Sequence, residues 1–436
     1  MSVIKIGNAG GFWGDDPAAP LRLARQAADL DVLTIDYLAE VSLSILAKQR
    51  DRGGPGYPKD ALHAIRSLMP LWQEGRQLSL VTNGGGLDPA GLAEAARDVM
   101  VEAGVHRKLA AVTGDDVLAM VCDTPESDHF RHLETGRPLK VVLDRLITAN
   151  AYVGAGEAAA AIGEGADLVL TGRLADPSMA VAPAMARFGW AADDWACLAG
   201  ATVAGHLIEC GQQVCGGIST DWLDLADKDC GYPIVEVAED GSCVVTKPAG
   251  TGGAVTELTV KEQLLYELGD PFQYLSPDCT VSFLTLDVER IGNDRVRVAG
   301  ATGSPPSEVY KVSAAYRDGY RCTGQLAFVN ARAKDAAHQS AELVLRKLER
   351  DARAPRRWNA EVIGDDERAI LRLGIADDDR GLCETFSRLI APLVTGGPPG
   401  TTGYADGRPP VREVVSYWPC LIPRERVTIS TTFFKS

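Results

Sequence analysis

Several common sequence signals are missing from this chain. No stretch of about 18 or more apolar residues occurs, which excludes a hydrophobic transmembrane helix. The first residues have neither the apolar core nor the cleavage site of a signal peptide. Ten cysteines are scattered without a CxxC pair, which argues against a zinc knuckle or a disulfide framework and is typical of a reducing compartment. We therefore expect a cytoplasmic protein.

An excess of basic residues is also absent. The formal net charge is −15, whereas a nucleic-acid-binding surface needs clustered lysine and arginine, and an anionic membrane attracts the same residues. No Walker loop, complete GxGxxG fingerprint or Gly-x-Ser-x-Gly elbow is present. The remaining class of partner is a small molecule. Acidity does not exclude a phosphorylated or CoA-linked one, because local geometry can outweigh the global charge.

The pattern that is present predicts an α/β fold. In the first half, short apolar runs lead into glycine-rich polar loops and then into segments of helical period, which predicts a mostly parallel sheet covered by helices. In the second half, strand-like runs precede one strong helix over residues 335–350, which predicts an α+β region with antiparallel strands. We expect domains at 1–255 and 256–436, which could pack as one unit.

Polar loops at the ends of the predicted strands are the candidate site, because ligands of such sheets bind at the carboxyl ends of the strands. Glycine lets backbone N–H groups approach a ligand closely. The alternative is that these loops are only tight turns. The candidate substrate-binding residues in them are Asn8, Gly10, Gly11, Asn83, Gly84 and Gly85.

Two further strand ends carry charged residues. Asp115 and Asp116 are candidate catalytic carboxylates, although either could instead cap the following helix. Arg173 could grip a carboxylate or phosphate with two parallel hydrogen bonds, or form a structural ion pair. Asp176 and Ser178 are candidate substrate contacts, and Asp176 before proline is also a good helix N-cap. On the first interpretation, Arg173→Lys weakens binding by about 1.5–3 kcal/mol and leaves the fold intact.

The segment 198–214 reads as an amphipathic helix whose polar stripe contains His206 and Glu209. Residues three apart on a helix could share a divalent metal or a proton relay, or form a satisfied polar face. A later cluster, with Lys247 before Thr251 and Gly252, could hold an anionic group or be a simple turn. The loop 393–404 is long enough for a lid or an oligomer contact, and we expect a homo-oligomer.

Blocks along essentially the whole chain resemble the acyclic terpene utilisation (AtuA-like) family. The matching blocks are Ile6–Asp15, Ile35–Glu40, Val81–Gly85, Gly114–Asp116, Leu170–Ser178, Ala204–Gly211, Val245–Gly253, Glu262–Glu267 and the tail from Ala391 to Arg426. The resemblance implies a role in breaking down citronellol-like and geraniol-like compounds as branched acyl-CoA thioesters, and a lyase or hydro-lyase step. It supplies no established catalytic residues. Cys215, where threonine is expected, and the segment 218–229 depart from the family pattern, so a terpene substrate does not follow.

The leading hypothesis is an enzyme that cleaves a C–C bond, or adds or removes water, in a carboxylated or CoA-linked small molecule. Asp115, Asp116, His206 and Glu209 would transfer protons or hold a metal, and Arg173 and Lys247 would hold the anionic end. The alternatives are an accessory subunit of an acyl-CoA carboxylase or hydratase, and a nucleotide-dependent ligase or transferase with phosphate at Gly84 or Gly252. We further expect Asn8, Asn83, Asp115, Arg173 and Asp176 to line one pocket, which His206 and Glu209 also face.

Overall fold

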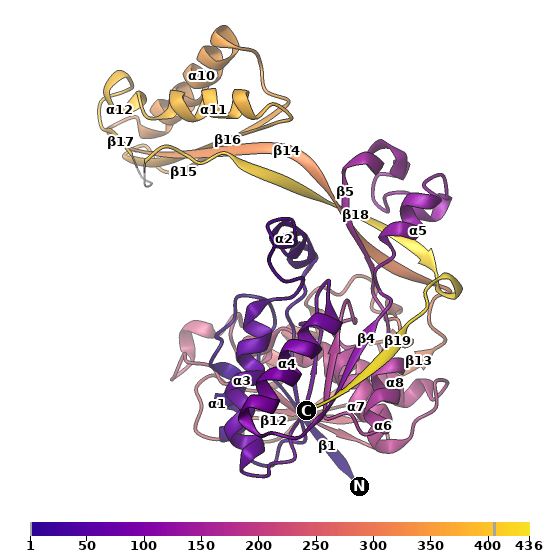
Figure 1. Ribbon diagram of the computed structural model, residues 1–436. Coiled ribbons are helices and arrows are strands. Elements are labelled where there is room, and N and C mark those ends of the chain that lie inside the picture. The colour runs from indigo at the N-terminus through magenta and orange to yellow at the C-terminus, as the bar shows by residue number, and fades with distance from the viewer. Residues whose placement is uncertain (1, 404–406) are drawn as a thin grey trace. The chain divides into compact units, whose positions relative to one another are not determined.

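The computed structural model describes residues 2–403 and 407–436 (Figure 1). By compactness the chain divides into two units. The first comprises residues up to 143, 147–314 and 417–436, and the second comprises 144–146 and 315–416. The division into domains at residue 255 stays a prediction. Within the described residues, no helix is long and apolar enough to cross a membrane.

A ten-stranded sheet forms the centre of the first unit. Its middle strands β1, β2, β3, β6 and β4 run parallel in that order, and antiparallel strands extend both edges. From one edge to the other the strands are β11 (Asp287–Gly292), β12 (Arg295–Ala299), β8 (Cys243–Thr246), β7 (Ile234–Ala238), β1 (Val3–Asn8), β2 (Val32–Ile35), β3 (Ser79–Thr82), β6 (Leu168–Thr171), β4 (Lys108–Thr113) and β19 (Ser430–Lys435).

Helices cover both faces of this sheet, as expected for parallel strands that are buried on both sides. Helices α1, α3 and α4 pack through apolar side chains on one face, and α6, α7 and α8 contact the other (Figure 1). The helices of this unit are α1 (Ala19–Gln26), α2 (Glu40–Arg50), α3 (Lys59–Gln73), α4 (Pro89–Ala103), α5 (Leu118–Asp123), α6 (Gly156–Gly163), α7 (Ser178–Phe188), α8 (Trp195–Ile208) and α9 (Glu257–Leu265).

Helix α8 differs from the predicted amphipathic helix over 198–214. It ends at Ile208, and a 3₁₀ turn over Gly211–Cys215 follows. The helix is buried on all sides from Leu198 to Ile208, so its apolar and polar stripes both face protein. A helix that is apolar or uncharged all round is typical of a core position.

Smaller strands complete the first unit. Three of them, β9 (Tyr274–Leu275), β10 (Thr280–Ser282) and β13 (Thr302–Ser304), form a small antiparallel sheet. Strand β5 (Leu146–Ala151) pairs with the long strand β14 (Val309–Val329), whose residues belong partly to each unit.

The second unit is an antiparallel sheet with helices, which confirms the predicted α+β region. Residues of β14 pair with β16 (Arg368–Asp377), and β16 pairs with β15 (Arg357–Gly364). Helices α10 (Ala333–Asp351) and α11 (Arg380–Ile390) pack on β16 through a separate apolar core. The remaining elements are α12 (Leu393–Gly396), β17 (Thr401–Gly403) and the first part of β18 (Arg412–Pro423), whose residues from 417 onward belong to the first unit. The predicted loop 393–404 is therefore a short helix and a strand, and Tyr404 lies outside the described residues.

Candidate functional site

A cavity of about 520 Å³ lies at the carboxyl ends of β1, β2 and β6. Its walls come from the loops after these strands, from the start of α2 and from the turn after α8. Every lining residue belongs to the first unit. Eleven of the lining side chains can carry charge or move a proton, and the seven that take part in the contacts described below are Asp36, Glu40, Tyr152, Arg173, Asp176, Glu209 and Lys311.

Arg173 is the most deeply buried cation of this cavity, with 2% of the residue exposed. Its two terminal nitrogens donate to the two carboxylate oxygens of Asp176, and one of them also donates to the carbonyl of Leu174. The guanidinium stacks on the Tyr152 ring at 4.1 Å. Burial disfavours the charge, but Asp176, Tyr152 and Asp36 outweigh it and raise the pKa of Arg173. Arg173 is therefore a fixed positive charge within the site.

Asp36 follows β2 and is almost fully buried. Asn83 Nδ2 donates to its carboxylate at 2.7 Å, and the backbone N–H of Leu38 donates to the same oxygen at 2.9 Å. Burial and the nearby Asp176 raise the pKa of Asp36 well above its ordinary value, although Arg173 and these donors act in the opposite direction. The site therefore contains a carboxyl group that holds its proton more tightly than a solvated aspartate does.

Glu209 and His206 form a buried pair at the end of α8. Nδ1 of His206 lies 3.0 Å from Oε1 of Glu209. Burial raises the pKa of Glu209 to about 7 although His206 opposes this, and the pKa of His206 is also raised, because Glu209 outweighs the effect of burial. Among the described residues, Oε2 of Glu209 has no hydrogen-bond partner, and neither has Nε of Arg173. Buried polar atoms without partners inside a cavity wall are expected where a ligand binds.

Tyr152, Glu40 and Lys311 form a third group. The Tyr152 hydroxyl donates to Glu40 at 2.8 Å, and Nζ of Lys311 lies 3.5 Å from the same carboxylate oxygen. Lys311 also lies over the Tyr152 ring, with Nζ 4.8 Å from its centre. The side chain of Lys311 is 45% exposed, so this amine can reach a ligand at little cost in desolvation.

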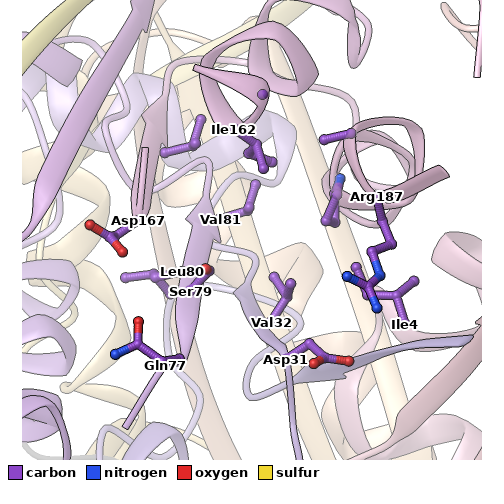
Figure 2. Close-up of a pocket in the computed structure, with 14 residues that line it drawn as sticks. Ile4, Asp31, Val32, Gln77, Ser79, Leu80, Val81, Ile162, Asp167 and Arg187 are labelled. Atoms are coloured by element: carbon purple, nitrogen blue, oxygen red, sulfur yellow. The ribbon is translucent and has the colours of Figure 1, made fainter. Parts of the chain in front are cut away.

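A different cavity, of about 400 Å³, lies at the opposite edge of the same sheet. Figure 2 shows its lining residues, among them Val32, Ser79 and Asp167, which lie at or just before the amino ends of β2, β3 and β6. Its floor consists mainly of apolar side chains of the strands. Because ligands of parallel sheets bind at the carboxyl ends, the cavity around Arg173 and Glu209 is the better candidate for the site.

Comparison with protein families decides the relationship of this chain. The acyclic terpene utilisation family protein AtuA matches residues 4–433, which is nearly the full length. The chain belongs to the AtuA family. No curated protein and no solved structure matches it.

The predicted residues of this AtuA-family chain fall into two layers around the cavity. Arg173, Asp176 and Glu209 line it, as predicted. Asn8, Asn83 and Asp115 do not, so the prediction that they share one pocket wall with Arg173 and Asp176 is wrong. His206 lies behind Glu209 and is likewise not part of the wall.

The three residues behind the wall each hold a lining residue in place. Nδ2 of Asn8 donates to the carbonyls of Ile208 and Glu209, at 2.6 and 3.0 Å. Asn83 fixes Asp36, and a carboxylate oxygen of Asp115 accepts the backbone N–H of Arg173 at 2.8 Å. A buried amide or carboxylate must find hydrogen-bond partners, and here backbone groups of the neighbouring loops supply them.

The remaining polar candidates lie away from the cavity wall. Asp116 is exposed and accepts the N–H of Leu118 just before α5, whose N-cap position is Val117 and not Asp116. Ser178 is buried and donates to Asp278.

The Lys247 cluster forms a closed turn. Nζ of Lys247 donates a hydrogen bond to the carbonyl of Thr251 at 2.7 Å and forms an ion pair with Asp294 at 3.4 Å. Gly252 forms an isolated β-bridge with Cys230. None of these three predicted residues lines the cavity.

The predicted glycines allow close packing, and of the four only Gly11 reaches the cavity. A Cβ on Gly11 would lie 2.6 Å from the carbonyl carbon of Cys210, so any side chain would displace the turn after α8. The carbonyl of Gly10 accepts the N–H of Asp36 at 2.9 Å. The other two approach neighbouring side chains and backbone: Gly84 against Tyr37 and Gly85 against Thr171.

Four further residues of the site were not predicted from the sequence: Asp36, Glu40, Tyr152 and Lys311. Asp36 directly follows β2, so the strand-end rule applied to the other strands could have found it. Glu40 begins α2, and Lys311 comes from β14, whose place beside the site depends on its long-range pairing with β5. No local pattern indicates that pairing.

A metal centre does not form from the candidate ligands. Across 2–403 and 407–436, no three His, Cys, Asp or Glu side chains converge in a way that could hold a metal ion. His206 and Glu209 contact each other instead.

We expect stability to fall as the pH rises from about 5 to about 8, and Glu209 to cause part of this fall. Its pKa is about 7 in the folded state against 4.5 ordinarily, and the pKa of His206 is also raised. The folded state therefore binds more protons than the unfolded chain, and the stabilisation is lost as the pH rises through the folded pKa values. Thermal unfolding should show Glu209→Gln melting a few degrees above the wild type at pH about 8 and level with it at pH about 5. If the melting temperature of Glu209→Gln depended on pH as that of the wild type does, this prediction would be contradicted. The control is Glu102→Gln, which removes a carboxylate from the exposed side of α4.

Proposed function

We propose that the cavity at the carboxyl edge is the active site of an enzyme that cleaves a C–C bond, or adds or removes water, in a small carboxylic acid or its acyl thioester. Glu209 carries this proposal. It is a carboxyl group with a pKa near neutrality, it is held by His206, and its free oxygen lies in the wall of a polar cavity. A general acid or base works best when its pKa is close to the working pH.

Both reactions begin with the removal of one proton by such a base. For loss of water, Glu209 takes the proton next to the carbonyl, the electron pair forms an enolate, and the hydroxyl leaves with a proton from an acid. For C–C cleavage, Glu209 takes the proton of the hydroxyl, the C–C bond breaks, and the enolate of the departing acid or thioester is then protonated. Asp36, whose pKa is raised by burial, is the proposed proton donor.

Lys311 is the proposed contact for the negative charge that develops. It is partly exposed, whereas the two terminal nitrogens of Arg173 are occupied by Asp176 and Leu174. The cationic side chain of Lys311 can donate a hydrogen bond to an enolate or carboxylate in the cavity. Arg173 then holds Asp176 and Tyr152 in place and supplies a fixed positive field.

The alternatives receive less support. A nucleotide-dependent reaction requires phosphate-binding loops at Gly84 or Gly252, yet Gly84 packs against Tyr37 and Ala61, and Gly252 packs against Asp227. If the chain were a purely structural subunit, the buried atoms of Arg173 and Glu209 that lack hydrogen-bond partners in one cavity would have no explanation. The family description, acyclic terpene utilisation, fits a branched acyl substrate.

A binding screen followed by product analysis tests the proposal. Branched, unsaturated and 3-hydroxylated acyl-CoAs, their free acids, nucleotides and divalent metals are compared by thermal shift, because a ligand of the folded state stabilises it by about 2.7 kcal/mol at a hundred times its Kd. We expect acids or thioesters to raise the melting temperature, and mass spectrometry to show loss or gain of water or a split carbon chain. Stabilisation by nucleotides alone, or binding without any change in the bound compound, would overturn the proposal.

A further inference from the structure

A second cavity adjoins the candidate site. It has a volume of about 340 Å³ and shares three lining residues, Tyr152, Asp176 and Lys311, with the cavity described above. All of its lining residues belong to the first unit. In contrast to the polar first cavity, most of its remaining wall consists of apolar or aromatic side chains: Tyr274, Leu275, Pro277, Val309, Tyr310 and Leu421.

Arg424 is the one cation of this wall that does not also line the first cavity. Its Nε donates to the carbonyl of Ser307 at 2.5 Å, and Nη2 donates to the carbonyl of Pro277 at 2.7 Å. The guanidinium stacks on Tyr310 at 4.2 Å, which fixes its plane. Within the part of the chain that the structure describes, Nη1 has no hydrogen-bond partner and no carboxylate lies within ion-pair distance of Arg424, although the carboxyl group of Asp278 interacts with it at longer range. A rigidly held guanidinium with a free donor is suited to binding an anion.

We propose that this cavity is a second chamber of the same site, and that it holds the apolar body of a substrate whose far end carries a carboxylate bound by Arg424. The inference rests on the proposed function, because the reacting end of the same molecule would lie in the polar cavity. Lys311 and Tyr152 border both chambers, so the substrate would pass along them. A single guanidinium with one free nitrogen matches the single charge of a carboxylate better than the higher charge of a phosphate ester.

The proposal names a class of substrate: an acyl compound with an acidic group at each end, one of which can be a thioester. Apolar walls favour longer chains, since each buried methylene raises affinity about threefold to fourfold. The terminal carboxylate adds a hydrogen bond between charged groups, which corresponds to an affinity about 10- to 100-fold higher than that of the matching monoacid.

The test measures the binding of two series of free acids, α,ω-dicarboxylic acids and monocarboxylic acids of increasing chain length. We expect the wild type to prefer the diacid over the monoacid of equal length about 10- to 100-fold, and Arg424→Met to lose that preference while still binding monoacids. Equal preference in wild type and variant would overturn the proposal. Monoacid binding also reports whether Arg424→Met is folded.

A second variant keeps the test decisive if Arg424→Met does not fold. Leu275→Trp, in the exposed strand β9, narrows the chamber and should weaken long acids at least tenfold without affecting short ones. Leu265→Trp, at an exposed leucine of α9 that lines neither cavity, is the control. Long acids that bind Leu275→Trp like the wild type would overturn the second chamber alone. No binding by any acid or thioester would overturn both this inference and the proposed function.

Discussion

Glu209→Gln is expected to lower kcat/KM by about 10²–10⁴-fold, the usual contribution of a general acid or base. Glutamine keeps the shape of the side chain and can still accept a hydrogen bond from Nδ1 of His206, which lies 3.0 Å away. It cannot take up a proton, so only the chemistry is removed. The measurement is steady-state turnover of a compound found in the binding screen, together with the affinity for the same compound.

Two further results separate catalysis from structure. Glu102→Gln removes a carboxylate from the exposed side of α4 and should leave turnover unchanged. The wild-type rate should also rise as the pH passes about 7, where Glu209 loses its proton, and the variant's residual rate should lack this rise. Full activity in Glu209→Gln would make the His206 contact a structural pair and remove the observation on which the proposed function depends.

The strand-end rule located the edge of the sheet and part of the wall, but it could not separate the two layers of residues. Asn83 and Arg173 both follow buried strands, and in sequence nothing indicates that one faces the backbone of the β2 loop and the other a cavity. Both side chains are buried, and the difference lies in the hydrogen bonds that each one makes. Asn83 has Tyr37 N–H and Asp36 as partners on either side, whereas Arg173 keeps a nitrogen without one among the described residues. Whether a buried polar group finds hydrogen-bond partners depends on the packed structure, so the sequence alone could not show this difference.

Other parts of the site depend on contacts between distant segments. Lys311 reaches the cavity because its strand pairs next to Tyr152, whose backbone N–H donates to the carbonyl of Lys311 at 2.9 Å. These residues are 159 positions apart by their numbers, and no periodicity relates them. The parallel sheet and the helix over residues 335–350 were predictable because their signals are local: apolar runs, glycine turns and a helical period.

Arg173→Met is expected to lower the free energy of unfolding by about 2–4 kcal/mol, because the buried guanidinium loses its hydrogen bonds and Asp176, whose side chain is 31% exposed, loses its cation. Asp176 would keep its charge next to Asp36, and the contacts of the guanidinium with Leu174 and Tyr152 would be lost as well. This differs from the expectation drawn from the sequence, in which Arg173 lay in a loop and Arg173→Lys left the fold intact. With Arg173 2% exposed, we now expect Arg173→Lys also to destabilise, by about 1–3 kcal/mol, because an amine cannot contact both oxygens of Asp176.

Urea unfolding of four variants distinguishes the two roles of this arginine. Arg187→Met makes the same change at an exposed position at the end of α7 and should alter stability by less than about 0.5 kcal/mol. Arg173→Met combined with Asp176→Leu should recover part of the loss, since the uncompensated charge is gone. If Arg173→Met is instead as stable as Arg187→Met and loses only ligand binding, the ion pair with Asp176 contributes nothing to the fold. Arg173 would then be a direct substrate contact through its free Nε, and Lys311 would no longer be needed for the anionic end.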